Sequence, residues 1–187
     1  RLTCKTPSMT WDEKFSELFN RCLSAYEHGN SDFMSYYTPN DREFLASIGY
    51  KPRELFDFVE DLADEGLPAQ STALLVAAVR RDYFLAVQSG KTSPRVISGS
   101  DVPSFSETFE GFAYLPRIVA KAEAKLRGEL DPDMMFGCGG DRKCLLENGE
   151  INLADFLRHV WAAAGDLSKV TRFVKKQSTT LPASASS

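Results

Sequence analysis

Residues 71–88 constrain the fold of this chain more than any other segment. Two runs within them, 73–79 and 83–87, are apolar on every side of a helix, a pattern typical of a helix that crosses the middle of a core. Between the two runs stand three charged residues, Arg80, Arg81 and Asp82. We therefore expect one central apolar helix with charged groups near its midpoint.

The most unusual of these charges is the carboxylate of Asp82. Its neighbours three and four positions away are Ala78, Val79, Leu85 and Ala86. An unpaired buried charge would cost several kcal/mol, so we expect Asp82 to have a partner. Two interpretations are open, an internal ion pair that locks two helices together and a ligand-binding role.

The rest of the chain shows helical spacing of apolar residues, framed by start and stop signals. Thr10 and Glu13 form a capping box, and Pro39, Pro52 and Pro116 suit the first turn of a helix. The helices expected outside 71–88 cover about 11–28, 39–49, 52–66, 115–127, 152–165 and 166–176. No strand-like alternation of useful length is present. The predicted fold is all-α, a compact bundle of about seven helices around the apolar central helix, with an irregular Gly-rich loop.

Composition divides the chain into five parts. Residues 1–9 are predicted to be a disordered stub and 10–89 an N-terminal helical part. Residues 90–106, rich in Gly, Ser, Pro and Thr, are predicted to form a linker loop. A C-terminal helical part follows at 107–176, and the Ser-, Thr- and Ala-rich tail 177–187 is predicted to be disordered.

The overall composition is that of a globular protein with its own core. Of 187 residues, 43% are hydrophobic and 26% charged, and 13 Phe supply bulky core material. A net charge of −4 without a long basic run argues against nucleic acid, because holding a phosphate backbone needs clustered Lys or Arg. The longest apolar run has seven residues, far fewer than the ~20 that a membrane span needs.

Cysteine usage and the first residues bear on location. Four cysteines at irregular spacing are too few for a secreted disulfide framework, which favours a reducing compartment and predicts a cytoplasmic protein. Residues 1–8 carry two basic residues, several hydroxyls and no acid, as in the remnant of a transit peptide. The interior of an organelle such as a plastid is therefore the alternative. A disordered tail or a cloning remnant explains the same stretch.

A row of cations lies along the predicted 115–127 helix. Arg117, Lys121 and Lys125 stand at i, i+4 and i+8, stacked along one side. Glu123 is the only acid within this helix, so the row is not balanced locally. It is either a solvated face or part of a binding site.

The stretch 137–142 holds three Gly in four residues, which let the backbone approach a ligand closely. Its amides and the adjacent cations suit an anion-binding concavity, and a tight turn is the alternative. The residues concerned are Gly139, Gly140, Asp141 and Arg142. Their spacing matches neither the phosphate-binding loop nor the dinucleotide fingerprint, and no cofactor is predicted.

Cys138 and Cys144 flank the Gly-rich stretch. Zinc sites favour two to four intervening residues and a second ligand pair, for which the chain offers only His28 and His159, so no metal site is predicted. A reversible disulfide between the two cysteines is the redox hypothesis. We expect two free thiols instead.

Three segments together resemble a known protein family: 114–128, the 137–142 loop and the 154–157 stretch, Ala-Asp-Phe-Leu. The chain resembles the domain-of-unknown-function family 5069, and with 55–61 and 79–85 the likeness covers about 11–176. The resemblance implies no catalytic residues, because that family has no assigned activity. Lys143 and Cys144 stand where it would have an aromatic residue, and Glu123 where a basic residue is common.

Two classes of function follow. The first is a non-catalytic module that binds a protein partner or assembly through acidic or aromatic surface between residues 33 and 64, because no nucleophile and base form a recognisable motif. The second is a small-molecule or anion-binding protein, a class that includes enzymes, with a pocket between the helix that carries the 80–82 charges and the 137–141 loop. Its ligand-binding residues would be Arg80, Arg81, Asp82, Arg117, Lys121, Gly139, Gly140, Asp141 and Arg142.

Overall fold

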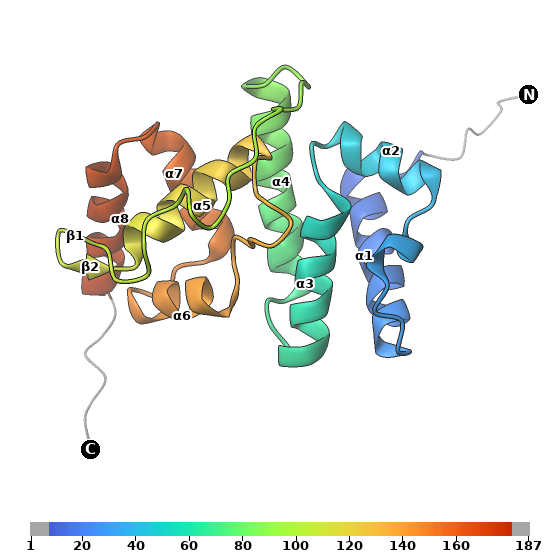
Figure 1. Cartoon of the computed structure of the whole chain (residues 1–187), viewed down its shortest axis with the longest axis horizontal. Coiled ribbons are helices and arrows are strands. Elements are labelled where there is room, and N and C mark those ends of the chain that lie inside the picture. Colours follow the sequence, from blue (N-terminus) through green and yellow to red (C-terminus); the bar gives the residue numbers. More distant parts are fainter. Residues whose placement is uncertain (1–7, 181–187) are drawn as a thin grey trace, which may run out of the picture.

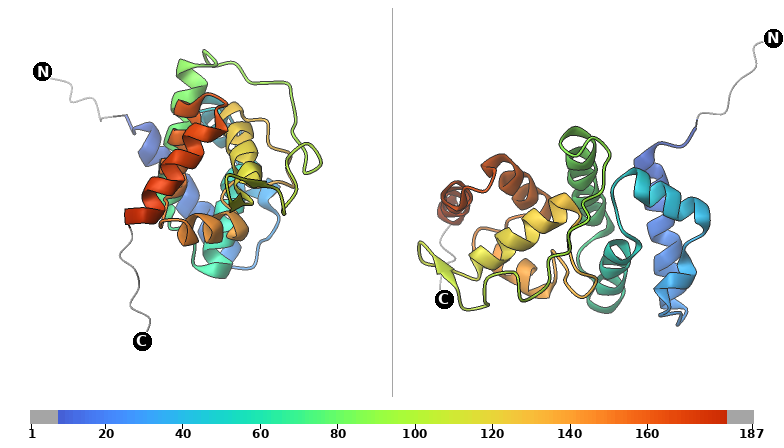
Figure 2. Two further views of the ribbon diagram at one scale, coloured as in Figure 1. Left: turned by 90° about the vertical axis from the view of Figure 1, so that its left-hand side faces the viewer. Right: turned by 45° about the horizontal axis from the view of Figure 1, so that its top comes forward.

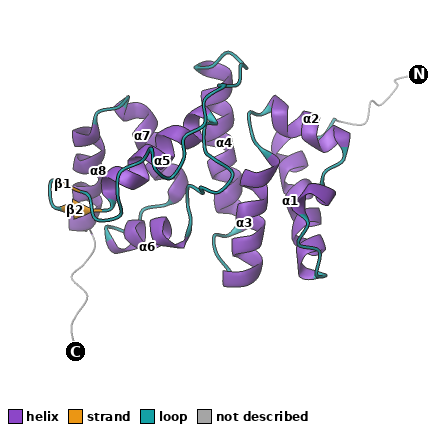
Figure 3. Ribbon diagram, viewed as in Figure 1, coloured by secondary structure: helices purple, strands orange, loops and turns teal. Residues whose placement is uncertain are grey.

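The computed structural model describes residues 8–180, in which helices are the dominant secondary structure (Figure 1). The all-α prediction is confirmed: these residues form eight α-helices, one short 3-10 helix and one small β-hairpin (Figure 3). The elements are α1 Trp11–Glu27, η1 Phe33–Tyr36, α2 Pro39–Ser47, α3 Pro52–Glu65, α4 Gln70–Ala86, β1 Thr108–Phe109, β2 Phe112–Ala113, α5 Leu115–Arg127, α6 Gly139–Glu147, α7 Leu153–Ala163 and α8 Leu167–Thr180.

Helix α4 joins the two halves of the molecule. It packs against α1 and α3 and also against α5 and α7, and Figure 1 shows it upright between α1–α3 and α5–α8. Buried side chains from both halves form one hydrophobic cluster. The segment between α4 and β1 runs along the outside of α5 (Figure 2), where Ile97 pairs with Leu130 as an isolated bridge. This connection therefore lies on a continuous core.

The prediction that α4 is apolar and buried on all sides is wrong. Its buried positions form one stripe at three- and four-residue spacing: Ala73, Val76, Ala77, Arg80 and Phe84, with Val79 beside them. Leu75 and Leu85, on the other side, are 45% and 44% exposed. The helices that pack against α4 leave a strip of its surface uncovered, so a central helix need not be an enclosed one.

The 3-10 helix η1, helix α6 and the β-hairpin were not predicted. Helix α6 occupies the Gly-rich stretch and continues to Glu147, with Cys138 as its N-cap residue. Glycine disfavours helix interiors, but Asp141 and Leu145 of this helix are buried, so tertiary contacts outweigh the local preference. The hairpin pairs Thr108 with Ala113, and two-residue strands are too short to leave an alternating pattern.

The two ends of the chain differ from the prediction in one respect. Helix α8 extends to Thr180, so residues 177–180, predicted as disordered tail, are helical. Residues 1–7 and 181–187, which contain most of the predicted stub and tail and Cys4, lie outside the described residues. Within 8–180, none of the helices combines the length and the apolar character that crossing a membrane demands.

Candidate anion-binding site

A cavity of about 280 Å³ opens where the start of α3, the end of α5 and the middle of α4 meet. We call it the Arg80 cavity. It is lined by Arg42, Ala46, Gly49, Tyr50, Lys51, Pro52, Arg80, Thr92, Ser93, Arg127 and Gly128. Its lining holds four cationic side chains and no carboxylate, so the wall is strongly positive.

Arg80 is the most deeply placed of these cations, with 1% of its surface exposed. Its Nη1 donates to Gln88 Oε1 at 2.8 Å, and Gln88 Nε2 donates to the carbonyl of Arg127 at 3.1 Å. The buried Nε has no hydrogen-bond partner in the part of the chain that the structure describes. Burial lowers the pKa of Arg80 from its ordinary value, and the more distant Glu54 opposes that change.

Gly128 makes room for the Arg80 side chain. A Cβ at this position would lie 2.5 Å from Arg80 Nη2, and the φ of +69° places Gly128 in the left-handed region. Glycine adopts that conformation without steric cost while it ends α5. Gly128, which ends α5, thus also leaves the space that the Arg80 guanidinium occupies.

Two further cations of the cavity have no acidic partner. Arg42 Nη2 donates to the carbonyl of Met34 at 2.9 Å, and Lys51 Nζ donates to that of Leu130 at 3.0 Å. Among the described residues, no carboxylate lies within 4.0 Å of the charged nitrogens of Arg42, Lys51 or Arg80, whereas Arg127 Nε is 2.8 Å from Glu129. Three positive charges at one cavity are therefore not balanced locally.

Tyr50 adds a second unsatisfied polar group to the same wall. The residue is 3% exposed, and its buried hydroxyl has no hydrogen-bond partner within residues 8–180. Most buried polar side-chain atoms do have one. Both Tyr50 and Arg80 line this cavity, but the unpaired Tyr50 hydroxyl and Arg80 Nε are themselves enclosed by protein and do not face its open space.

The nearest acid in the core is already paired. Glu54 Oε1 lies 2.9 Å from Lys125 Nζ, an ion pair that lacks the alignment of a hydrogen bond, and both side chains are buried. Glu54 Oε2 accepts the amide of Lys51 at 3.0 Å. Because Lys125 already balances Glu54, that carboxylate leaves the charge of Arg80 largely uncompensated.

Asp57, one helical turn further along α3, gives a pH-dependent prediction. Burial raises its pKa from 3.8 to about 6, although Arg53 and Lys125 favour the carboxylate. The folded state therefore binds this proton more tightly than the unfolded chain, and the stability it provides is lost as pH rises from about 4 to 6. We expect Asp57→Asn to raise the free energy of unfolding at pH 7 by about 1–3 kcal/mol.

Urea unfolding at pH 4.5 and pH 7 measures that effect. The increase in the free energy of unfolding caused by Asp57→Asn should be smaller at pH 4.5, where Asp57 in the folded wild-type protein is largely protonated. Asp133→Asn, at an exposed position, is the matched control and should leave the profile unchanged. The same difference in the free energy of unfolding between Asp57→Asn and wild type at both pH values would contradict a raised pKa of Asp57.

The three charges predicted to lie together in α4 separate in the structure. Arg80 is buried in the cavity, while Arg81 and Asp82 form a surface pair at 3.2 Å, in which the Asp82 side chain is 62% exposed. The prediction that Asp82 is buried and locks two helices together is wrong, because Asp82 points to the uncovered strip of α4 with Leu85 and its partner Arg81 belongs to the same helix. Arg81 lies over the Trp11 ring instead.

The predicted row of cations is neither a solvated face nor one binding site. Lys121 and Lys125 are 3% and 2% exposed, and each forms an ion pair with an acid on another helix, Asp141 and Glu54. Arg117 donates to the carbonyl of Pro103 at 2.8 Å and stacks over Phe105. Two of the three charges that looked unbalanced along the sequence, Lys121 and Lys125, are therefore balanced in space, whereas Arg117 has no carboxylate within 4.0 Å among the described residues.

The Gly-rich stretch does not join Arg80 in one cavity. Asp141, with no exposed surface, accepts hydrogen bonds from Lys121 Nζ, from the Tyr114 hydroxyl at 2.9 Å and from the Gly137 amide at 2.8 Å. Arg142 is held by Asp61 and Glu65, each at 2.6 Å. Asp141 therefore supplies the negative charge that an external anion was predicted to bring.

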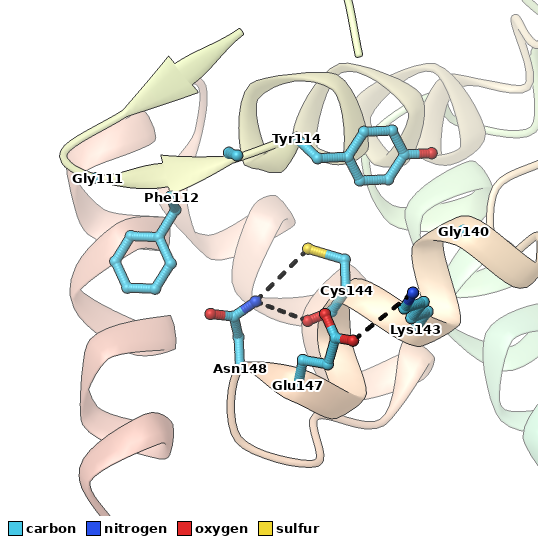
Figure 4. Close-up of a pocket in the computed structure, with 9 residues that line it drawn as sticks. Gly111, Phe112, Tyr114, Gly140, Lys143, Cys144, Glu147 and Asn148 are labelled. Carbon is cyan, nitrogen blue, oxygen red and sulfur yellow. Dashed lines mark hydrogen bonds and ion pairs between the residues drawn. The ribbon is translucent and has the colours of Figure 1, made fainter. Parts of the chain in front are cut away.

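Gly140 instead lines a separate cavity of about 380 Å³ between the hairpin and α6 (Figure 4). Tyr114 faces Cys144 across it, and Asn148 Nδ2 lies 3.6 Å from the Cys144 sulfur. Cys138 and Cys144 are free thiols, and Cys138 accepts a hydrogen bond from Lys121 Nζ at 3.3 Å. Burial raises the pKa of Cys144, which disfavours the reactive thiolate.

No protein-family model, no curated protein and no solved structure matches this chain. The resemblance to the domain-of-unknown-function family 5069 therefore stays a prediction. The site rests on geometry alone. Sequence reasoning identified Arg80 but missed the residues that surround it, Arg42, Tyr50, Lys51, Arg127 and Gly128. They come from three separate segments without a shared motif, and no sequence signal brings them together.

Proposed function

We propose that this protein binds a small anionic ligand in the Arg80 cavity. The observation that carries the proposal is the buried guanidinium of Arg80, which has no carboxylate partner among the described residues. The same wall holds two partly buried cations, Arg42 and Lys51, that also lack such a partner. A charge removed from water costs several kcal/mol unless it is paired. A bound anion would supply the missing partner, and its binding would be strengthened by the low local dielectric.

The proposed anion site differs from the alternative drawn from the sequence in its location. Arg80 is common to both, but the Gly-rich loop, Arg117 and Lys121 are replaced by Arg42, Lys51 and Arg127. The chemistry is the same, capture of a negative group by guanidinium and ammonium groups. Arginine suits that task because its planar fork matches the oxygens of a carboxylate or phosphate.

A protein-binding module is the weaker proposal. The aromatic residues of 33–64 that suggested a partner surface pack on one another, with the Phe33 and Phe56 ring centres 5.0 Å apart. The acids of α3 are also engaged, since Asp61 and Glu65 bind Arg142 and Asp64 accepts the Tyr26 hydroxyl. The internal use of these groups reduces the surface offered to a partner.

Thermal unfolding with and without anions tests the proposal. Inorganic phosphate, sulfate and citrate are the probes, each titrated at constant ionic strength. A ligand at 100 times its Kd adds about 2.7 kcal/mol of stability, which for a chain of this size raises Tm by roughly 5–10 °C. We expect at least one probe to do so.

Arg80→Met is the decisive variant, because it keeps a side chain of similar length and removes the charge. We expect it to fold with a stability equal to or above that of wild type, since it relieves a buried unpaired cation, and to lose the anion-induced rise in Tm. Arg172→Met, at an exposed position of α8, is the matched control and should keep the rise. An unchanged rise in Arg80→Met would overturn the proposal.

A further inference from the structure

The charges and the size of the Arg80 cavity say more about its occupant, provided that the proposed anion binding is correct. Arg42, Lys51 and Arg80 leave three positive charges without a carboxylate partner, while Arg127 is held by Glu129. A monoanion would balance one of the three. A compact group with two negative charges fits this wall better, because every additional charge gains attraction from several cations at once.

The cavity is also larger than a bare anion and smaller than most organic ligands need. Its volume of about 280 Å³ lies just below the ~300–1,000 Å³ typical of small-molecule pockets. Part of the lining carries no charge: Ala46, Pro52 and the ring of Tyr50 offer apolar surface, and Thr92 and Ser93 offer hydroxyls. This wall can hold a short carbon body that carries the charged group.

We infer that the Arg80 cavity takes the phosphate monoester of a small, sugar-sized molecule, with the phosphate among Arg42, Lys51 and Arg80. A phosphate monoester carries a charge of about −1.5 to −2 at pH 7 and three strong acceptor oxygens. Those oxygens meet two guanidinium forks and one ammonium.

Paired probes measured by titration calorimetry at pH 7.5 test this inference. Glucose 6-phosphate and glucose 6-sulfate share one body and differ by about one charge. We expect glucose 6-phosphate to bind at least about tenfold more tightly than glucose 6-sulfate, because the second charge interacts with several cations. Inorganic phosphate, without the body, and adenosine monophosphate, with a much larger one, should both bind more weakly than glucose 6-phosphate.

Variants of the lining cations and the full set of probes distinguish two claims: that the cavity binds an anion, and that this anion is a phosphate monoester. Arg42→Gln and Lys51→Gln should each reduce the ratio of the affinities for glucose 6-phosphate and glucose 6-sulfate. Lys143→Gln, at an exposed cation outside this cavity, should leave that ratio unchanged. If glucose 6-sulfate or inorganic phosphate binds as tightly as glucose 6-phosphate, a phosphate monoester is the wrong ligand class, but anion binding stands. If none of these probes nor citrate binds, the proposed function itself fails.

Discussion

Replacing Asp141 by asparagine is expected to lower the free energy of unfolding by about 3–5 kcal/mol, because it leaves the buried ammonium of Lys121 without a counter-charge. Lys121 Nζ lies 2.7 and 2.9 Å from the two carboxylate oxygens, and both side chains are almost entirely buried. The carboxylate also accepts from Tyr114 and Gly137. An amide has one acceptor oxygen where the carboxylate has two, so at least one of these donors loses its partner.

Urea unfolding followed by circular dichroism measures this loss, which is a large fraction of the 5–15 kcal/mol that stabilises a typical protein. Asp82→Asn is the matched control, since the exposed Asp82 carboxylate has Arg81 as its one ion-pair partner among the described residues and the change should alter stability by less than about 0.5 kcal/mol. Equal stabilities for Asp141→Asn and Asp82→Asn would show that the buried pair contributes nothing.

The sequence predicted those parts of the fold that depend on local chemistry. The capping box at Thr10 begins α1, Pro39 lies in the first turn of α2, and Gly66 and Gly128 end α3 and α5 in the left-handed conformation. Each of these signals acts within a few residues of chain. Helix boundaries were therefore readable without knowledge of what packs against them.

Helix α6 could not be predicted in the same way. Its first residues, Gly139 and Gly140, have poor helix propensity, and the element is fixed by contacts distant in sequence, with Asp141 held by Lys121 and Arg142 by Asp61. The same limit applies to the cation row on α5. Whether a lysine is solvated or buried depends on an acid that may stand seventy residues away, as Glu54 does for Lys125.

The candidate site likewise has one part that the local sequence predicts and another that depends on tertiary packing. Apolar neighbours along α4 correctly placed one charge, Arg80, in the core, but they suggested burial for Asp82 as well. The two residues lie two positions apart and so face different sides of the helix. Only the packing of α1, α3, α5 and α7 decides which side is covered, and that information is not contained in the composition of α4 itself.

The second large effect concerns the ion pair between Lys125 and Glu54, beside the Arg80 cavity. We expect Lys125→Met to cost about 3–5 kcal/mol, because Glu54 then stays buried with its Oε1 unpaired. Glu54→Leu should cost a similar amount, since it strands the Lys125 ammonium between the rings of Tyr50 and Phe58. It also removes the acceptor for the Lys51 amide at the start of α3.

The double variant, Lys125→Met with Glu54→Leu, measures how much the ion pair contributes to the free energy of unfolding. Burial lowers the pKa of Lys125 while Glu54 raises it, so desolvation and attraction oppose each other within the pair. Apolar replacement of both members removes the two opposing effects together, and we expect the double variant to lie within about 2 kcal/mol of wild type, well above the sum of the single losses. Chemical unfolding of all four proteins gives the coupling energy. Additive losses would mean that the two residues stabilise the core independently, and that Glu54 is not the acid that balances Lys125.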